Sequence, residues 1–247
     1  MALSADQIQR YARHIVLREI GGAGQNALLA STVAIIGAGG LGGPAGMYLA
    51  AAGVGRLTLI DDDVVELSNL QRQIQFIDAD MNTGKAEAMA RTLKARTPDI
   101  EVNIQTLRLT EENAIDLLRD HDVILDGTDL FSTRLIINQA SRQLNIPLVS
   151  GALGRFDMQL GVFNTQSEAP CYRCFVGDLP DAERNCVTEG VLGAMAGMCG
   201  SMMAMETIKL ITKAGEPLSG RLYMFDALRA EGRTIQLSKD PACPICR

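Results

Sequence analysis

Short apolar runs alternate with helix-like segments along the first 150 residues of this 247-residue chain. Residues 32–36 (TVAII) and 56–60 (RLTLI) are rich in β-branched and aliphatic side chains, and between them lies a small-residue segment that stops at Gly53. The alternation then repeats. We therefore predict strands at residues 32–36, 56–60, 101–105, 122–125 and 147–150, and helices at residues 41–52, 83–96, 111–119 and 132–144.

Strands that alternate with helices in this way form a parallel, doubly wound sheet. Beyond residue 150 the order changes to strand-like segments at residues 157–164, 221–225 and 233–237, which are broken by a loop and a methionine-rich helix. We expect these added strands to be antiparallel. The predicted fold class is therefore α/β, with a mainly parallel sheet extended by antiparallel strands.

The N-terminal segment opens with a capping-box pattern, Ser4 followed three residues later by Gln7. Apolar residues at positions 8, 11 and 15 then share one face of the expected helix. We expect this helix to end before the glycine pair that starts at Gly21.

Composition narrows the class of protein. Hydrophobic residues make up 47% and charged residues 21%, which excludes a mostly disordered chain. The formal net charge of -6 argues against a general nucleic-acid surface. Because polar and acidic residues precede any apolar run, the N-terminus does not have the pattern of a secretory signal, and we expect a cytoplasmic protein.

Residues 191–205 (VLGAMAGMCGSMMAM) form a charge-free run that raises the question of a membrane span. A span needs roughly 20 apolar residues. This run is shorter and rich in glycine, so we expect a buried core helix and no membrane association. Gly193, Gly197 and Ser201 recur every four residues and are expected to allow close approach of another backbone or a subunit.

A glycine turn, GAGGLG, follows the first predicted strand. At Gly37, Gly39, Gly40 and Gly42, absent side chains let backbone N–H groups reach a phosphate at the N-terminus of the next helix. Asp61 ends the next strand, from where a carboxylate accepts hydrogen bonds from ribose hydroxyls. Together they indicate a Rossmann-like adenine-nucleotide site, although NAD, FAD and ATP share this geometry.

Cationic residues directly after the second strand shift the balance toward ATP. Arg72 lies in the run Asn69-Leu-Gln-Arg-Gln73, and Lys85 follows Thr83-Gly84. A triphosphate whose pyrophosphate must leave needs cations, for which an NAD enzyme has little use. Taken alone, each of them could be a solvated surface charge.

Two further carboxylates, Asp126 and Asp129, lie at the carboxyl end of the fourth strand, where open α/β sheets bind their ligands. Mg²⁺ prefers one or two carboxylates together with phosphate oxygens, so the pair predicts a magnesium site. The alternative is that Asp129 only caps the following helix.

Four of the six cysteines form two CxxC pairs. In a cytosolic chain this spacing favours a metal over disulfides, and four thiolates complete a tetrahedral Zn²⁺ site. Such a site would be structural and would hold the C-terminal tail against the body, whereas the alternative is two unrelated thiol pairs. The four predicted zinc ligands are Cys171, Cys174, Cys243 and Cys246.

With these motifs in view, the chain resembles the MoeB/ThiF/HesA family, bacterial relatives of the ubiquitin-activating enzymes, over essentially its whole length. The resemblance rests on RYARH near the start, the GAGGLG turn, LTLIDDD, SNLQRQ, GK at Gly84-Lys85, LDGTD, the two CxxC pairs and METIK. Members of the family adenylate the terminal glycine of a ubiquitin-like sulfur carrier, for molybdopterin or thiamin synthesis, and work as homodimers.

The resemblance implies a role for each matching residue. It also implies three cofactors, namely ATP, Mg²⁺ and Zn²⁺. Gly39, Gly40 and Asp61 would bind the adenosine and phosphates, Arg72 and Lys85 the triphosphate, and Asp129 the Mg²⁺, with Asn69 and Gln73 supporting the phosphate region. Arg13 resembles an arginine that reaches into the neighbouring subunit's site. Leu130 is a departure, because the family usually has asparagine after the aspartate.

The same resemblance implies the partners. The substrate would be a MoaD- or ThiS-like carrier. Sulfur would come from a separate donor, such as a cysteine desulfurase or rhodanese, because the chain has no rhodanese-like extension. Cys186 resembles the cysteine that thiamin-type members link covalently to the carrier, and Cys199, in an apolar helix, is expected to be inert. We predict one domain: residues 1–30 as N-terminal helices, 31–150 as the nucleotide-binding half and 151–247 as the carrier-binding and zinc half.

Three other functions compete with this one. A tRNA-modifying adenylating relative shares the fold, but the acidic balance weighs against it. An NAD-dependent oxidoreductase is disfavoured by the cations around the phosphate site. A non-catalytic binding module is suggested only by Leu130.

Overall fold

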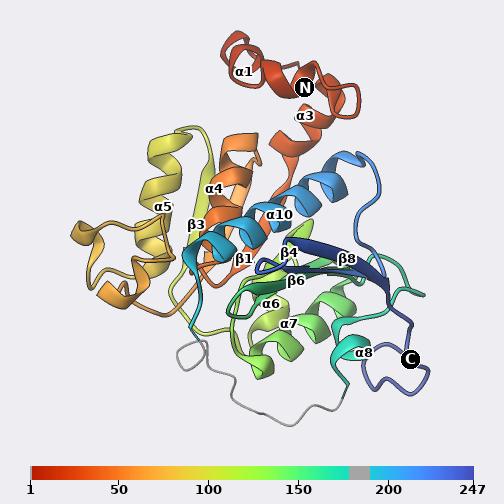
Figure 1. Cartoon of the computed structure of the whole chain (residues 1–247). Coiled ribbons are helices and arrows are strands. Elements are labelled where there is room, and N and C mark those ends of the chain that lie inside the picture. The colour runs from red at the N-terminus through yellow and green to blue at the C-terminus, as the bar shows by residue number, and fades with distance from the viewer. Residues whose placement is uncertain (1, 178–189) are drawn as a thin grey trace.

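The computed structural model describes residues 2–177 and 190–247. Eight strands form one sheet in the order β3-β2-β1-β4-β5-β6-β7-β8 (Figure 1). Strands β1 to β5 pair in parallel and β5 to β8 pair antiparallel, which confirms the predicted fold class. The strands are β1 (Thr32–Ile36), β2 (Arg56–Ile60), β3 (Glu101–Gln105), β4 (Val123–Asp126), β5 (Leu148–Leu153), β6 (Asp157–Phe163), β7 (Arg221–Asp226) and β8 (Glu231–Gln236).

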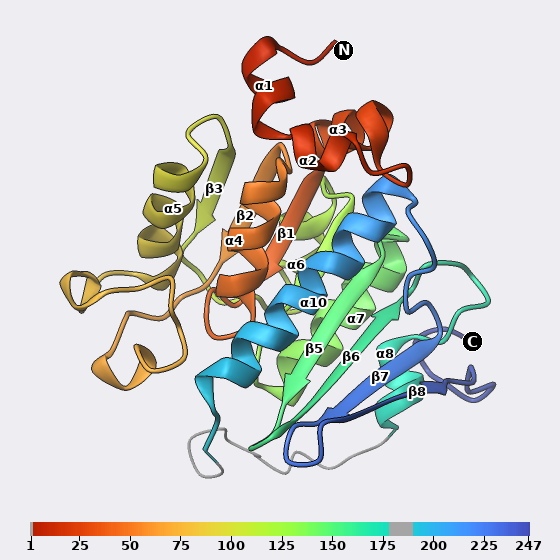
Figure 2. The same cartoon turned by 45° about the horizontal axis from the view of Figure 1, so that its top comes forward.

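Helices cover both faces of this sheet (Figures 1 and 2). Successive side chains of a strand point to opposite faces, so Val33 and Ile35 of β1 enter one core while Ala34 and Ile36 enter the other. The helices that pack on the first core are α4 (Gly42–Ala52), α5 (Lys85–Arg96) and α10 (Gly193–Thr212). Those on the second core are α6 (Ala114–Leu118), α7 (Phe131–Leu144) and α8 (Tyr172–Val176).

The strand order reverses between β1 and β4. From β1 the chain moves outward to β2 and β3, and it then returns to β4 on the other side of β1. The helices that follow β1 and β4 therefore leave toward opposite faces of the sheet. Such a reversal opens a crevice at the carboxyl ends of the two strands, where ligands of α/β sheets bind.

The N-terminal segment differs from the prediction. The capping box is present, but three short helices follow instead of one, and Gly21 begins the third of them. Only Tyr11 of the predicted apolar face is buried, and Ile8 is half exposed. Tyr11 is the C-cap residue of the first helix, and its ring packs so closely on Gly53 that a Cβ there would lie 2.6 Å from it. The three are α1 (Ala5–Arg10), α2 (Ala12–Ile15) and α3 (Gly21–Ala30).

The helix predicted at residues 111–119 is also shorter than expected, since α6 begins only at Ala114. The Oδ1 atom of Asn113 accepts a hydrogen bond from the backbone N–H of Thr110 at 2.8 Å. Asparagine side chains that bond nearby backbone groups compete with helix formation, and here the residues before Ala114 form a turn.

The methionine-rich segment forms the buried helix α10. Among the described residues, no helix is long and apolar enough to cross a membrane. Close backbone contacts are made at Gly193 and Gly200, where a Cβ would lie 2.3 and 2.5 Å from backbone carbonyl oxygens of other segments. Gly197 faces open space, and Ser201 donates to the Gly197 carbonyl. Within this chain, the described close backbone contacts of α10 are therefore at Gly193 and Gly200, and a subunit contact at Gly197 and Ser201 stays a prediction.

Candidate active site

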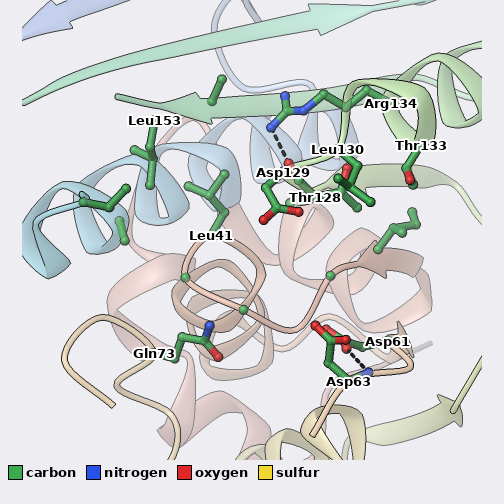
Figure 3. A pocket seen from close by; sticks show the side chains of 18 of the residues that line it. Leu41, Asp61, Asp63, Gln73, Thr128, Asp129, Leu130, Thr133, Arg134 and Leu153 are labelled. Atoms are coloured by element: carbon green, nitrogen blue, oxygen red, sulfur yellow. Dashed lines mark hydrogen bonds between the residues drawn. The ribbon is translucent and has the colours of Figure 1, made fainter. Parts of the chain in front are cut away.

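A cavity of about 440 Å³ opens where β1, β2 and β4 end (Figure 3). Its walls come from the glycine turn, the crossover segment (residues 61–84, between β2 and α5), the turn after β4 and the β5–β6 hairpin. The structure thus brings together residues from four separate motifs. The sequence-predicted residues that line it are Gly37, Gly39, Gly40, Asp61, Arg72, Gln73, Lys85 and Asp129.

The glycine turn is held by direct backbone contacts. Gly37 adopts a φ of +86°, a conformation that L side chains rarely adopt. Gly42 does not belong to the described lining of the cavity, and a Cβ there would lie 1.9 Å from the Gly37 carbonyl oxygen. Its role is therefore to let helix α4 start against the turn. Gly39 and Gly40 present their backbone to the cavity.

The Asp61 carboxylate is anchored by two backbone N–H groups. Its Oδ2 accepts from Ala38 at 2.7 Å and its Oδ1 from Asp63 at 2.9 Å. Burial raises the pKa of Asp61, and these two hydrogen bonds together with the nearby Lys85 act against that rise. A carboxylate offers about four acceptor positions, so Asp61 can still accept hydrogen bonds from a ligand.

Both predicted cations are held at the cavity wall. The Nζ of Lys85 lies 2.9 Å from the Oδ2 of Asp63, with the lysine side chain 11% exposed and the aspartate side chain 60% exposed. The Nη1 of Arg72 donates to the Ser68 carbonyl at 2.9 Å. These bonds hold the charged ends of both side chains at the border of the cavity.

The two polar neighbours of Arg72 differ in position. Asn69 ends a short 3₁₀ turn, accepts a hydrogen bond from the Glu66 N–H at 3.3 Å and is absent from the described lining. Its side chain shapes the crossover segment. Gln73 lines the cavity, is 5% exposed, and its Oε1 has no hydrogen-bond partner among the described residues. An orphaned buried acceptor at a cavity wall is suited to a donor from a ligand.

The two carboxylates after β4 have different environments, so the structure does not bring them together as a pair in the cavity. Asp126 is fully buried and accepts hydrogen bonds from the backbone and hydroxyl of Thr128, at 3.0 and 2.7 Å, and from the Ser150 hydroxyl at 2.9 Å. Its Oδ2 also lies 3.8 Å from Arg134. Asp129 is exposed and lines the cavity (Figure 3). Of these two carboxylates, Asp129 belongs to the described lining of the cavity and Asp126 does not.

Arg134 is a cavity residue that sequence reasoning missed. It is 5% exposed and donates hydrogen bonds to the Thr128 carbonyl and, at 3.3 Å, to the Ser150 hydroxyl. With Asp126 it forms the buried frame of the turn that carries Asp129 (Figure 3). The only signal in the sequence was a cation in the first turn of a helix that follows a strand-end aspartate.

Leu130, the departure from the family pattern, lies at the edge of the cavity and is 42% exposed. It occupies the N-cap position of α7 without a side-chain cap. The alternative that Asp129 merely caps this helix is not supported, because no side chain caps α7.

Arg13 and the two unpaired cysteines lie apart from this cavity or outside the described residues. Arg13 is exposed on α2, next to α3, which leads into the start of β1, whereas the cavity lies at the carboxyl end of β1 (Figure 2). Cys186 falls outside the described residues. Cys199 is buried, and burial raises the pKa of its thiol to about 12, which agrees with inert packing.

The four paired cysteines come together at α8 and the C-terminal tail. Their Sγ atoms all lie within 4.8 Å of one another. The Sγ of Cys171 lies 3.9 Å from that of Cys174 and 3.7 Å from that of Cys243, and Cys174 and Cys246 are 3.3 Å apart. A tetrahedron with Zn–S bonds of about 2.3 Å has S···S edges of about 3.8 Å. The cluster therefore has the dimensions and the donor chemistry that could hold zinc.

Comparison with known proteins gives several relatives that match nearly end to end. The chain is 42% identical to the SAMP-activating enzyme E1 of Haloferax volcanii, covering 100% of this chain and 91% of the relative. It is 39% identical to the sulfur carrier protein adenylyltransferase of Thermus thermophilus, covering 100% and 93%. It is 44% identical to the sulfur carrier protein ThiS adenylyltransferase of Escherichia coli, covering 96% and 94%.

Solved structures share the same fold. A crystal structure of Escherichia coli MccB with ATP has a TM-score of 0.84 at 22% identity, covering 96% of this chain and 74% of that one. This likeness concerns the fold alone. The model of the ThiF family matches residues 11–245. With that match, and with the relatives above aligned over nearly their full length, the chain belongs to the ThiF family.

Proposed function

We propose that this protein transfers AMP from ATP to the C-terminal carboxylate of a ubiquitin-like sulfur-carrier protein. The observation that carries the proposal is the convergence of the Gly39–Gly40 backbone, Arg72, Lys85 and Asp129 on one cavity. Backbone donors, two cations and a free carboxylate are what a magnesium triphosphate requires. The names of the Thermus and Escherichia coli relatives supply the acceptor, a sulfur-carrier protein.

Within the proposal, Asp61 receives the ribose hydroxyls, and the Gly39 and Gly40 N–H groups with Arg72 and Lys85 hold the phosphates. Asp129 holds Mg²⁺, since it is an exposed carboxylate on the cavity wall and hard oxygen donors suit that ion. When bound, Mg²⁺ supplies positive charge to the phosphate oxygens. The unpaired Oε1 of Gln73 is available to a donor group of the substrate.

The reaction joins one carboxylate oxygen of the carrier's terminal glycine to the α-phosphorus of ATP, and the bond from that phosphorus to the bridging oxygen of pyrophosphate breaks. A carboxylate is already the nucleophile, so no proton has to be removed. The described lining of the cavity accordingly contains neither histidine nor cysteine. The contribution of the chain is alignment and charge neutralisation by Arg72 and Lys85.

Sulfur is proposed to enter in a later step from a separate donor protein, such as a cysteine desulfurase or a rhodanese. The terminal sulfur of a persulfide on that donor would attack the carbonyl carbon of the acyl-adenylate, and AMP would leave. A second thiol would then cleave the acyl disulfide, forming a disulfide with the donor sulfur and releasing the thiocarboxylate of the carrier.

Pyrophosphate exchange tests the proposed function. Labelled pyrophosphate should enter ATP when a ThiS-type carrier is present, because adenylation is reversible until AMP is displaced. The same carrier without its terminal glycine should give only background exchange, and so should tRNA. Exchange with tRNA, or equal exchange without any acceptor, would contradict a protein-carrier substrate.

Asp129→Ala should lower this exchange rate by at least about 100-fold, the scale on which single electrostatic contributors act in such sites. Because Asp129 is exposed, the melting temperature should stay close to that of the wild type. The matched variant Asp126→Asn should instead reduce the free energy of unfolding by about 3 kcal/mol, since it breaks a buried ion pair. Near-normal exchange by Asp129→Ala would remove this residue from the proposed metal site.

A homodimer in which Arg13 serves the partner's cavity is a further part of the proposal. Helix α2, which carries Arg13, lies beyond the amino end of β1 (Figure 2). The cavity lies at the carboxyl end of this five-residue strand, about 17 Å away. Mixing inactive Arg13→Ala chains with inactive Asp129→Ala chains should restore exchange, because each mixed dimer then has one complete site. Activity that stays at the level of the two parents after subunit exchange would show that Arg13 does not act across subunits.

We also propose that Cys171, Cys174, Cys243 and Cys246 bind one structural Zn²⁺. Metal analysis should find about one zinc per chain. Chelation should lower the melting temperature and zinc should restore it, because structural zinc contributes roughly 10 kcal/mol or more of apparent binding free energy. The proposal fails if a metal-free preparation melts at the same temperature as the zinc-loaded protein.

A further inference from the structure

Gln75 in the crossover segment makes an unusual contact behind the glycine turn. Its side chain is 3% exposed, and its Nε2 donates to the carbonyl oxygen of Ala38 at 2.7 Å and to that of Gly39 at 3.1 Å. Its own backbone carbonyl accepts from the Thr92 hydroxyl of α5 at 2.9 Å. One buried amide therefore holds two consecutive peptide groups of the turn and is itself anchored to a helix.

The orientation of these two peptides decides what the cavity offers to a phosphate. A trans peptide directs its C=O and N–H to opposite sides, and the described chain contains no cis peptide. When Gln75 holds the Ala38 and Gly39 carbonyls on its side, the N–H groups of Gly39 and Gly40 point away from it. Gly39 and Gly40 line the cavity and Gln75 does not. Across the described residues, neither N–H group has a hydrogen-bond acceptor.

Without Gln75, the peptide between Ala38 and Gly39 would have no described partner on its carbonyl and would be free to turn. Glycine populates both signs of φ about equally, so a turn built from Gly39 and Gly40 can present carbonyl oxygens to the cavity as well as N–H groups. A carbonyl oxygen aimed at a phosphate would repel it. The carbonyl oxygen of Gly39 also accepts a hydrogen bond from the Gly43 N–H at 2.9 Å. The carbonyl oxygen of Ala38 has one partner among the described residues, the side-chain amide of Gln75.

The remaining atom of the Gln75 amide argues against a purely structural role. Its Oε1 is buried without a hydrogen-bond partner among the described residues. Leaving such an oxygen unpaired costs about 1–3 kcal/mol, and an apolar side chain of similar length would fill the same space without that cost. What glutamine adds at this position is the pair of N–H donors to the turn.

We infer that Gln75 is a positioning residue for phosphate binding: it fixes the Gly39 and Gly40 peptides with their N–H groups toward the phosphates of ATP. The inference rests on the proposed function, since it assigns these two N–H groups to the nucleotide. It concerns a residue that does not itself touch the substrate.

The test compares a ligand that carries phosphates with one that does not. Calorimetric titration of the full-length chain with magnesium ATP and with adenosine gives both dissociation constants. In Gln75→Met, which keeps the side-chain length but removes the donors, the Kd for ATP should rise about tenfold while that for adenosine stays unchanged. A tenfold change corresponds to about 1.4 kcal/mol, the scale of hydrogen bonding to a charged group.

Gln25→Met is the matched control. Gln25 is also fully buried and donates to a single backbone carbonyl, that of Ala52, at 3.0 Å. It belongs to α3, away from the cavity lining, so its replacement should leave both dissociation constants unchanged. A second variant, Gly43→Ala, leaves the Gln75 amide in the protein but moves it. A Cβ at Gly43 would lie 2.2 Å from the Gln75 side chain and should displace that side chain from the turn. This variant should therefore also raise the Kd for ATP and leave the Kd for adenosine unchanged.

Three results would overturn the inference. ATP binding that is unchanged in both folded variants would show that the turn keeps its orientation without Gln75. An equal loss of ATP and adenosine binding would show a general structural effect. If the wild-type chain binds adenosine but not ATP, the proposed function itself fails. Should Gln75→Met not fold, Gly43→Ala carries the same comparison.

Discussion

The contact on which the site depends is a meeting of three glycine backbones at the ends of β1 and β4. A Cβ at Gly42 would lie 1.9 Å from the Gly37 carbonyl oxygen, one at Gly37 would lie 3.0 Å from the Gly127 carbonyl oxygen, and one at Gly127 would lie 3.0 Å from the Gly42 nitrogen. No side chain fits between these segments. The turn after β1 and the turn after β4 are therefore one packed unit, and the backbone donors of the first have a fixed position relative to Asp129 of the second.

The charges beneath this unit are arranged so that the surface carboxylate stays free. Arg134 is surrounded by acceptors, namely Asp126, the Ser150 hydroxyl and the Thr128 carbonyl, so its charge is compensated inside the protein. A buried ion pair is costly to break and contributes little net stability, but it holds its geometry firmly when every donor and acceptor is satisfied. Both carboxylate oxygens of Asp126 are occupied by these buried contacts. Asp129, only three residues later, is left to meet an external cation.

The sequence was sufficient to predict those features that depend on residues close together in the chain. Buried parallel strands have continuous apolar runs, and the predicted bounds of β2 and β3 match the structure. The glycine turn and the CxxC pairs were recognisable because their spacing is set by the group that they bind. The burial of Arg134 was not recognisable, because its partners lie on a strand end and on another strand. The break in the N-terminal helix was not recognisable either: local periodicity placed Tyr11 on an apolar face, but its contact with the distant Gly53 is not visible in the neighbouring residues.

Lys85 shows how the cavity is prepared before a nucleotide arrives. Its stem is almost fully covered, while its ammonium group lies 2.9 Å from the largely exposed carboxylate of Asp63. An exposed carboxylate binds a cation only weakly, because water screens the pair. A phosphate group in the cavity can therefore take the place of Asp63 at the ammonium without a large loss. The covered lysine stem meanwhile keeps its place, so little reorganisation is needed when charge develops on the phosphates. Arg134 differs, because its charge is compensated by the buried Asp126 and its donors are taken up by the Thr128 carbonyl and the Ser150 hydroxyl.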